Sequence, residues 1–561
     1  MADGPGRQPV VSDRPPVPAD ATGGLGNGGA KSRRRSPRMA GHCGRGAAGR
    51  RAGRPGAMTQ SPDPLVALTA LAARATALLS KQLWQQGDYR QAATTLDQAI
   101  ALAPDAGGWQ IRRSILIPPV PASSAEIDET REDCRTRLLR LVGDGPPPVS
   151  DPVADIDWTS YLLSYHGLHQ NGAMNRLFHR VCAMASPGLD WQAPHCAACR
   201  KPGRTRVGFI SWYFNDHTIR RLFGGLIERV DPDGLDVRVF GIEGNDAFLR
   251  DGMLYGKRAV PLPADLHRAR EAIAAEELDL LVYLDLGMDP FTLFLAHARL
   301  APVQAVLWGH PDTTGIPAID VFLSCDAMEP EDADEHYDER LVRLPGPGCW
   351  YVRPVDGPRP GAAEFGLPEQ AVLYLCPQTP QKFHPDFDPV IRQILTTVGG
   401  AHLVLTAGWS VPLMERVKAR ITAPAPDLAD RIHILPAMDR DRFMGLMRLC
   451  DVMLDPLHYS GGNSSLEALA FGMPIVTWPG RFMRARHTFG FYRLMGLSDC
   501  VARDPDNYVE IAVALGRDPA ARAALRDKIR TRSACLFEDD LVVRAFEAFA
   551  AAAVGKAAGQ R

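Results

Sequence analysis

The chain has 561 residues, a formal net charge of −2 and 23% charged residues, which is the composition of a globular protein with roughly three or four domains. The charge is uneven, because residues 1–57 hold eleven Lys and Arg against three Asp and the remainder carries a net −10. An acidic body argues against sequence-independent binding of nucleic acid by the folded part.

No uninterrupted apolar run approaches the length of a membrane span, and no signal-peptide pattern opens the chain. The eleven cysteines are scattered without the spacing of a disulfide framework. These observations predict a cytoplasmic protein that is not integral to a membrane.

Residues 1–57 are rich in Gly, Pro, Arg and Ala and contain almost no large apolar side chains, so they are predicted to form a disordered basic tail. The run from Lys31 to Arg38 fits a polyanion-binding segment. The favoured interpretation is simpler: translation begins at Met58, where globular sequence starts. A mass measurement on protein from the native host decides between the two.

Residues 58–150 are predicted to form a helical, tetratricopeptide-like region. The segment 79–104 places its key residues as a tetratricopeptide helix pair does, at Leu83, Trp84, Gly87, Tyr89, Ala92, Leu96, Ala99 and Pro104. A single repeat does not bury both of its faces, so it should pack on helices at 62–78 and 127–142. Two interpretations remain: a remnant of a partner-binding solenoid, or a helical hairpin used for packing.

A Pro-rich linker at 143–154 leads into a helical connector, residues 151–203. The pairs His179/Cys182 and Cys196/Cys199 have the spacing of zinc ligands. His179 and Cys182 fit the interior of a helix equally well, so this pattern is weak.

Two α/β lobes follow, at residues 204–360 and 361–561, because short buried strands alternate with helices in both. Strands of the first are predicted at 206–212, 237–242, 278–284, 303–308, 321–324 and 341–344, and of the second at 371–376, 402–406, 432–435, 452–454 and 475–478. Closing helices are predicted at 522–533 and 539–552. The alternation predicts parallel sheets with ligands at the carboxyl ends of the strands.

The stretch from Asp455 to Gly480 reads as a loop, a helix and a strand that follow a short apolar strand. Gly461 and Gly462 allow a sharp turn and a close approach to a ligand. N-cap residue types follow, namely Asn463, Ser464 and Ser465. A glycine loop that leads into a helix is an anion site, because amide groups and the helix dipole both favour a phosphate there. An ordinary capped helix without a ligand fits the same pattern.

Three further side chains are candidates. Glu467, early in that helix, is suited to accept hydrogen bonds from a ribose diol. Lys382 follows the first strand of the second lobe and suits a phosphate oxygen, although most lysines are only solvated. His217 follows the first strand of the first lobe and suits a base or a positioning group, although a lone histidine is usually neither.

No Walker lysine motif and no GxGxxG loop occurs beside these residues, and the sequence is interpreted as lacking a DxD-type acidic pair that serves a divalent metal. The pattern is therefore typical of a transferase that neutralises a departing nucleoside diphosphate with a lysine and amide groups, without a metal ion or other cofactor.

The span from about Arg206 to Phe549 resembles the catalytic region of the protein O-GlcNAc transferase/SPINDLY family and its bacterial relatives, the cytoplasmic N-glucosyltransferases. The matching blocks are VGFISWYFNDH, LAPVQAVLWGHPDTTG, CPQTPQKF, CDVMLDP, GGNSSLEALAFGMPIVT and DNYVEIAVALGRD. The resemblance implies a GT-B fold, with two Rossmann-like lobes facing a cleft, and an inverting, metal-free reaction with a UDP-linked sugar.

The resemblance also implies roles for single residues. His217 matches the active-site histidine, Lys382 the lysine on the donor phosphates, and Gln378 lies in the adjacent donor loop. Residues 462–465 match the pyrophosphate loop, Glu467 the ribose-binding residue, and Arg440 a lysine near the uracil. Arg221 stands where the animal enzymes have a second histidine. His310 and Asn463 favour the N-glucosyltransferase branch, with His310 counted among the donor-binding residues.

These observations predict an inverting, metal-independent transferase that moves GlcNAc or glucose from a UDP-sugar to a polypeptide, on Ser/Thr oxygen or Asn nitrogen. The alternatives are a GT-B enzyme that acts on a small molecule or glycan, and an inactive scaffold built on helical repeats. UDP-GlcNAc or UDP-glucose and an acceptor polypeptide are the expected partners. The sequence leaves the sugar, the linkage, the target and the oligomeric state open.

Overall fold

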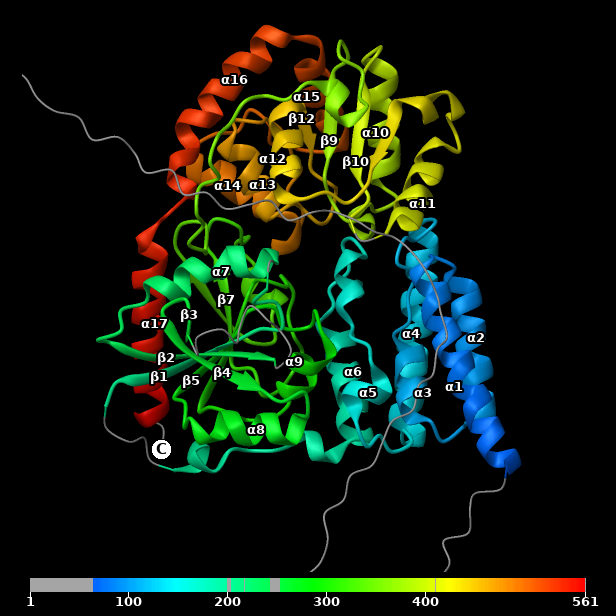
Figure 1. Cartoon of the computed structure of the whole chain (residues 1–561), viewed down its shortest axis with the longest axis vertical. Coiled ribbons are helices and arrows are strands. Elements are labelled where there is room, and N and C mark those ends of the chain that lie inside the picture. The colour runs from blue at the N-terminus through cyan, green and yellow to red at the C-terminus, as the bar shows by residue number, and fades with distance from the viewer. Residues whose placement is uncertain (1–63, 199–202, 216, 243–252, 409, 560–561) are drawn as a thin grey trace, which may run out of the picture. The chain divides into compact units, whose positions relative to one another are not determined.

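The computed structural model describes residues 64–198, 203–215, 217–242, 253–408 and 410–559. The predicted tail, residues 1–57, lies outside these ranges, and so does Cys199 of the predicted zinc pairs. The described chain consists of a helical region followed by two α/β lobes, in the order that the sequence predicts (Figure 1).

The helical region comprises α1 (Pro64–Gln85), α2 (Tyr89–Leu102), α3 (Gly107–Ser114), α4 (Ser124–Asp144), α5 (Pro152–Ile156), the 3₁₀ helix η1 (Tyr161–Tyr165) and α6 (Gly172–Ala185). Helices α1 and α2 pack on each other as the repeat-like pattern predicts. Trp84 fixes this hairpin, because its Nε1 donates to the carbonyl oxygen of Ile117 at 2.7 Å and its ring meets that of Trp158 edge-on. The Pro-rich segment is packed as well, since the amide of Val149 donates to the carbonyl oxygen of Ala185.

Helix α1 is, by length and composition alone, long and apolar enough to cross a membrane, although Thr69 and Arg74 interrupt it. Only 17% of its most apolar window is buried. One helix of this kind is weak evidence for a span, because core helices and signal sequences pass the same test.

The first lobe is built on a sheet of eight strands. Their order is β3 (Met253–Leu254), β4 (Lys257–Leu262), β2 (Leu235–Ile242), β1 (Thr205–Ile210), β5 (Leu280–Tyr283), β6 (Val303–Leu307), β7 (Val321–Cys325) and β8 (Arg340–Leu344). Every pairing is parallel except that of β3 with β4. The helices of this lobe are α7 (Thr218–Arg229), α8 (Leu266–Ala275) and α9 (Pro290–Leu295).

Strands β3 and β4 are absent from the sequence-based prediction. Strand β4 contains Pro261, which lacks an N–H group and usually argues against a strand. Pro261 is paired with Gly241 of β2 near one edge of the sheet, where the loss of one ladder hydrogen bond is tolerated.

The second lobe is built on a five-stranded, all-parallel sheet. The strand order is β11 (Ile432–Leu435), β10 (His402–Thr406), β9 (Leu373–Cys376), β12 (Val452–Leu454) and β13 (Ile475–Val476). Its helices are α10 (Phe387–Thr397), α11 (Val411–Thr422), α12 (Arg440–Leu449), α13 (Asn463–Ala470), α14 (His487–Met495), α15 (Pro505–Arg517) and α16 (Pro519–Arg532). The predicted α/β class, with two parallel-sheet lobes after an all-α region, is confirmed.

The last helix, α17 (Asp540–Gly559), does not close the second lobe, as the sequence predicted, but returns to the first (Figure 1). The ring of its Phe546 lies 5.3 Å from that of Phe209 in β1, between centroids. Its Asp540 accepts a hydrogen bond from the indole of Trp350 at 3.0 Å. Apolar periodicity predicts that a helix is buried but not which sheet buries it.

The backbone therefore passes between the lobes twice, after β8 and again before α17. The two passages run side by side, because the amide of Glu538 donates to the carbonyl oxygen of Tyr351 at 3.0 Å. Arg353 reinforces this contact through a hydrogen bond to the Ser533 hydroxyl. The two connections between the lobes thus lie next to each other and are joined by hydrogen bonds.

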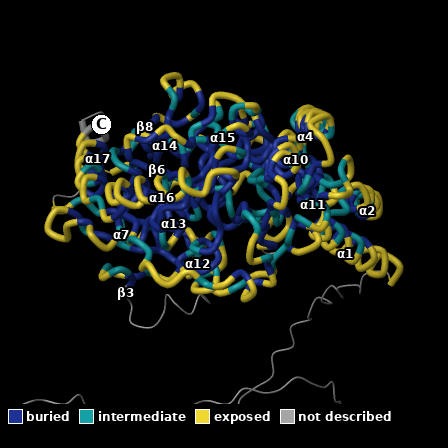
Figure 2. Tube along the Cα trace, turned by 90° about the horizontal axis from the view of Figure 1, so that it is seen from above, coloured by how far each residue is buried: buried dark blue, intermediate teal, exposed yellow. Residues whose placement is uncertain are grey.

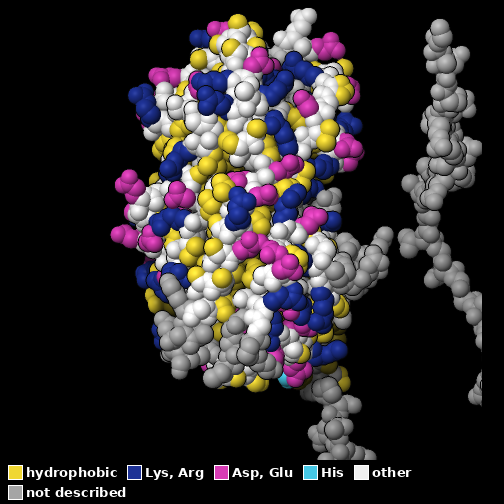
Figure 3. Space-filling model, turned by 90° about the vertical axis from the view of Figure 1, so that its left-hand side faces the viewer, with side chains coloured by type: hydrophobic (Ala, Val, Ile, Leu, Met, Phe, Trp, Pro, Cys, Tyr) yellow, Lys and Arg dark blue, Asp and Glu magenta, His cyan; other side chains and the backbone are white. Residues whose placement is uncertain are grey.

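Buried residues concentrate within the two lobes, whereas α1, α2 and α4 carry long exposed stretches (Figure 2). On the face shown in Figure 3, Lys and Arg side chains are interspersed with Asp and Glu. This face presents mixed charge rather than the basic stripe that polyanion binding uses.

Arg484 joins the second lobe to the rest of the chain and is 1% exposed. Its guanidinium lies 3.4 Å from the carboxylate of Asp312 in the first lobe. It also donates to the carbonyl oxygens of Gly167 and His169, in the connector between η1 and α6. One buried cation therefore binds three parts of the chain.

We predict that Arg484→Ala lowers the stability of the protein strongly. The substitution leaves the buried Asp312 carboxylate without its cation, which typically costs about 3–5 kcal/mol. Urea denaturation followed by tryptophan fluorescence measures the effect. Arg481→Ala is the matched control, because this exposed arginine should change stability by no more than about 0.5 kcal/mol. If the two variants unfold at the same urea concentration, the stabilising role assigned to Arg484 is wrong.

Candidate functional site

A cleft of about 670 Å³ lies where the carboxyl ends of the strands of both lobes meet. The first lobe contributes the start of α7 and the residues after β6, and the second lobe contributes the residues after β9 and the start of α13. The connector adds two tyrosines of η1. A volume of this size suits a small-molecule ligand, and strand carboxyl ends are where parallel sheets bind ligands.

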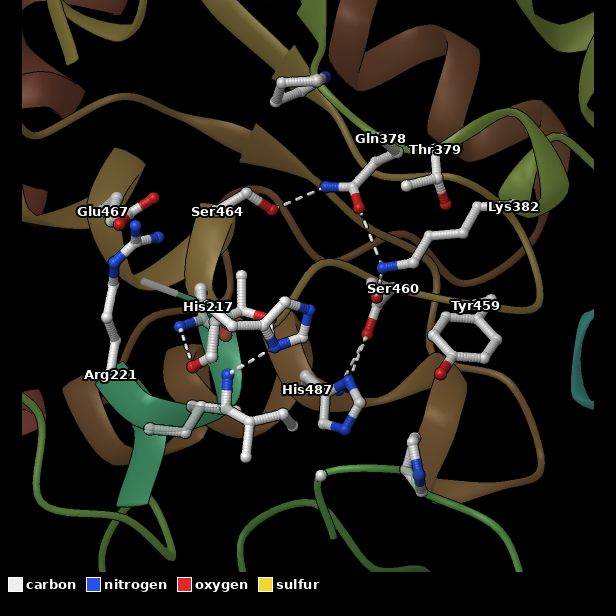
Figure 4. Close-up of a pocket in the computed structure, with 18 of the residues that line it drawn as sticks. His217, Arg221, Gln378, Thr379, Lys382, Tyr459, Ser460, Ser464, Glu467 and His487 are labelled. Atoms are coloured by element: carbon white, nitrogen blue, oxygen red, sulfur yellow. Dashed lines mark hydrogen bonds between the residues drawn. The ribbon is translucent and has the colours of Figure 1, made fainter. Parts of the chain in front are cut away.

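Lys382 presents its ammonium group to this cleft from a half-buried side chain (Figure 4). Its Nζ donates to Gln378 Oε1 at 2.8 Å and to the carbonyl oxygen of Ser460 at 3.0 Å. The same atom lies 4.7 Å from the centre of the Tyr459 ring. Partial burial lowers the pKa of Lys382 to about 8, against the opposing influence of the Asp455 carboxylate. The result is a cation in a fixed position.

Asp455 fixes the glycine loop that faces this ammonium group. One carboxylate oxygen accepts the amide hydrogen of Gly461 at 2.7 Å, and the other accepts the Thr477 hydroxyl at 2.8 Å. Burial raises the pKa of Asp455 to about 6, although both hydrogen bonds favour the ionised form. Asp455 therefore sets the course of the loop from the strand end to the helix.

Helix α13 begins at Asn463, and its N-cap is Gly462 without a side-chain capping bond. The predicted capping role of Asn463, Ser464 and Ser465 is therefore wrong. Asn463 instead donates across the cleft to the carbonyl oxygen of Thr218 at 3.1 Å. The amides of Ser465 and Leu466 donate to the carbonyl oxygen of Gly462, so those of Asn463 and Ser464 are the first-turn amides left for a ligand at this helix start.

The two serines that follow differ in direction. Ser464 lines the cleft, and its hydroxyl accepts a hydrogen bond from Gln378 Nε2 at 2.7 Å. Ser465 is fully buried, and its hydroxyl pairs with that of Thr488 at 2.8 Å. Gln378 thus bridges Lys382 and the helix start, whereas Ser465 belongs to the core.

Glu467 and Arg440, predicted to contact ribose and base, form an ion pair at 2.7 Å beside the cleft. The Tyr351 hydroxyl donates to the same carboxylate oxygen of Glu467 at 3.0 Å. Arg221 of the first lobe also lines the cleft, and its side chain points toward Glu467 in Figure 4. Two arginines and one carboxylate therefore form this end of the cleft.

His217 is the N-cap of α7, because its Nδ1 accepts the amide hydrogen of Ile219 at 3.3 Å. Its ring stacks on that of Tyr213, with centroids 4.3 Å apart. In the neutral ring the proton then resides on Nε2. The cap and the stacking hold the imidazole at the side of the cleft that belongs to the first lobe.

His310 and Gly461 do not line the cleft themselves. The ring of His310 is 7% exposed, and its Nε2 lies 3.2 Å from the Ser164 hydroxyl, behind the wall that Gly309 and Pro311 form. Gly461 lies under the loop, where it permits the approach of Gln378 and Ser465. Both positions support the wall of the cleft rather than its surface.

The sequence did not identify Tyr161, Tyr165, Tyr459 and His487 as lining residues of the cleft. Tyr165 stacks on Tyr459 at 4.5 Å between centroids, and its hydroxyl contacts that of Tyr161. His487 lies 3.3 Å from the Ser460 hydroxyl, and burial together with the Lys382 charge lowers its pKa to about 3. The sequence shows that position 487 is a histidine, but it gives no indication that this histidine lies beside Lys382.

The predicted zinc residues do not come together. His179 Nδ1 lies 3.0 Å from His297 Nε2, and Cys196 Sγ faces the carbonyl oxygen of Arg299. Across the described residues, neither pair belongs to a group of three potential metal ligands. The zinc interpretation of these pairs is therefore not supported.

Two parallel-sheet lobes with a cleft at the strand carboxyl ends define the GT-B class of fold. A solved O-GlcNAc transferase mutant from Thermobaculum terrenum matches 88% of this chain and 93% of its own chain, with a TM-score of 0.66 and 23% sequence identity. This likeness shows the fold.

Residues 360–542 match the model of Glycosyl transferase family 41. The chain is 28% identical over 272 residues to a probable UDP-N-acetylglucosamine–peptide N-acetylglucosaminyltransferase SPINDLY of Solanum lycopersicum, over 47% of this chain and 29% of that one. It is 26% identical over 245 residues to a UDP-glucose:protein N-beta-glucosyltransferase of Actinobacillus pleuropneumoniae, over 43% of this chain and 38% of that one. Residues 360–542 are thus similar to this glycosyltransferase family, and the chain spans less than a third of the length of the plant relative.

We predict that Gly461→Ala destabilises the protein whereas Gly462→Ala does not. A Cβ at position 461 would meet Ser465 Oγ at 2.5 Å and Gln378 Nε2 at 2.8 Å, so the bond between Gln378 and Ser464 would be lost, at about 1 kcal/mol. A Cβ at position 462 would meet no atom within 4 Å. Thermal denaturation of the two variants measures the difference, and the opposite order would contradict the loop geometry.

Proposed function

We propose that this protein transfers a sugar from a UDP-sugar to a polypeptide side chain, with inversion at the anomeric carbon and without a divalent metal ion. The observation that carries the proposal is the Lys382 ammonium group, which is half-buried, lines the cleft and adjoins the start of α13. A cation and a helix N-terminus that face one space form a site for a diphosphate.

The names of the relatives support the donor and the acceptor class. One relative is named for UDP-N-acetylglucosamine and peptide, and another for UDP-glucose and protein. Both names share a uridine diphosphate donor and a polypeptide acceptor. GlcNAc and glucose are therefore the two sugars to test.

In the proposed reaction, the acceptor oxygen or nitrogen forms a bond to the anomeric carbon while the bond from that carbon to the β-phosphate oxygen breaks. The electron pair leaves with UDP, whose growing negative charge is stabilised by Lys382 and by the first-turn amides of α13. Because Gln378 and Ser460 already hold the ammonium group, little reorganisation is needed as this charge develops.

The acceptor also loses a proton, which passes to water. His217 lies on the first-lobe side of the cleft, and we assign it the acceptor side. Because its Nδ1 already accepts the Ile219 amide hydrogen, the neutral ring would position the acceptor by donating from Nε2 rather than act as the base. His487 is a poor base as well, because its pKa is lowered to about 3. Glu467 and Arg440 are assigned to the ribose and the base.

The helical region is proposed to guide an extended polypeptide toward the cleft, since η1 of the connector lines the cleft directly. Free thiols support a working place in the reducing cytoplasm, and they occur at Cys134, Cys182, Cys325, Cys349, Cys376, Cys450, Cys500 and Cys535.

We predict that Lys382→Ala lowers kcat by about 10²–10³-fold, as removal of one electrostatic stabiliser does in other enzymes. Turnover is measured as UDP release in the presence of acceptor polypeptide. Lys528→Ala is the matched control, because Lys528 is an exposed lysine paired with Asp499 and should keep its turnover. If Lys382→Ala retains the wild-type turnover in a folded protein, the site assignment is wrong.

We predict that UDP-glucose or UDP-GlcNAc, incubated with the protein and a lysate of its native host, adds one hexose or N-acetylhexosamine to a polypeptide. Intact-protein mass spectrometry identifies both the sugar and the acceptor, and addition of Mg²⁺ or Mn²⁺ should not increase the yield.

Lys382→Ala protein serves as the blank in this incubation. Sugar transfer only to glycans or small molecules would favour the alternative acceptor class. An absence of UDP binding in calorimetry would favour an inactive scaffold.

A further inference from the structure

A cluster of two histidines and one aspartate lies in the second lobe and shares no residue with the lining of the donor cleft. His384 and Asp386 follow Lys382 along the chain, and His458 precedes Tyr459 and Ser460. One potential ligand atom from each of the three side chains lies within 4.8 Å of the other two. Residues distant in the sequence thus converge on one point.

The distances within the cluster match those between the ligands of a tetrahedral metal ion. Asp386 Oδ2 lies 3.3 Å from His384 Nδ1 and 2.9 Å from His458 Nε2. Ligand bonds of about 2.0–2.1 Å in a tetrahedral zinc site place neighbouring ligand atoms about 3.3 Å apart. Small side-chain adjustments would therefore admit an ion.

The donor set has the chemistry that zinc uses. Both imidazole rings are buried, at 7% and 5% exposure, whereas the Asp386 side chain is 49% exposed. Two imidazoles, a carboxylate oxygen and a side open to water form a three-ligand site of the kind that zinc binds.

The hydrogen bonds of the three side chains are compatible with metal binding. The amide of Asp386 donates to His384 Nδ1 at 3.2 Å, and the Ser124 hydroxyl donates to the other oxygen, Asp386 Oδ1, at 2.9 Å. His384 Nδ1 therefore accepts a backbone hydrogen bond in this structure, and an ion bound to this atom would take the place of that hydrogen bond. His458 has a positive φ of 73°, a rare conformation outside glycine, and its Nδ1 is buried without a hydrogen-bond partner.

We propose that His384, Asp386 and His458 bind a zinc ion, with water as a fourth ligand. The ion would join the segment that carries Lys382 to the segment that carries Ser460, the two parts of the chain that hold the ammonium group. It would also reach the helical region through the bond from Ser124 to Asp386. This role is structural, and it is compatible with a metal-free transfer in the cleft.

The test uses the untagged full chain, loaded with zinc chloride and then desalted, with metal content measured by elemental mass spectrometry. We expect one zinc per chain in the wild type and a lower content in Asp386→Asn and His458→Gln. Competition with a chromophoric chelator should show an affinity at least about 10-fold weaker in each variant, since even outer-shell changes have effects of that size.

The matched control is His433→Gln, since His433 and His402 also form a histidine pair, 2.8 Å apart, but belong to no group of three ligands among the described residues. This variant should keep its zinc. A melting temperature that falls on chelation in the wild type and in the control, but not in Asp386→Asn, supports the proposal without any dependence on sugar transfer.

Three outcomes would overturn it: wild-type protein without stoichiometric zinc, zinc content unchanged in Asp386→Asn, or zinc lost equally in His433→Gln. If the variants at the proposed ligands fail to fold, the test is the absorption spectrum of wild-type protein loaded with cobalt in place of zinc. A tetrahedral cobalt spectrum with imidazole and carboxylate ligands would support the site, and an octahedral aquo spectrum would refute it.

Discussion

The Lys382 ammonium group is the point around which the second lobe is arranged. It is half-buried and thus partly removed from water, and it donates hydrogen bonds to Gln378 and to the carbonyl oxygen of Ser460. Those two partners belong to different strand ends, and Gln378 in turn holds Ser464 at the start of α13. The stabilisation of one cation thereby fixes the relative positions of the strand end, the glycine loop and the helix.

Much of this architecture was predictable, because strands buried on both faces appear as short apolar runs. All but two of the strands were located in this way, and the exceptions, β3 and β4, are a two-residue strand and one that contains Pro261. Several residues of the cleft were also predictable, since Lys382, Gln378 and Ser464 directly follow a strand or begin a helix. Local sequence determines which side chains stand at strand ends.

Contacts between distant segments were not predictable in this way. Whether a residue beside the cleft faces it or the core depends on neighbours from other elements, as His310 and Ser465 show. Tyr161 enters the cleft from the connector, which no motif marked. Helix α17 had a clear apolar face, but its choice of the first lobe depends on Phe209 and Trp350.

The paired passages of chain between the lobes restrict how the two halves can move. Because Glu538 and Tyr351 hold the passages together, any movement of one lobe against the other must accommodate this contact. Tyr351 also touches the carboxylate of Glu467 in the cleft. One residue therefore links the crossing between the lobes to one end of the cleft, so a ligand that contacts Glu467 would also act on that crossing.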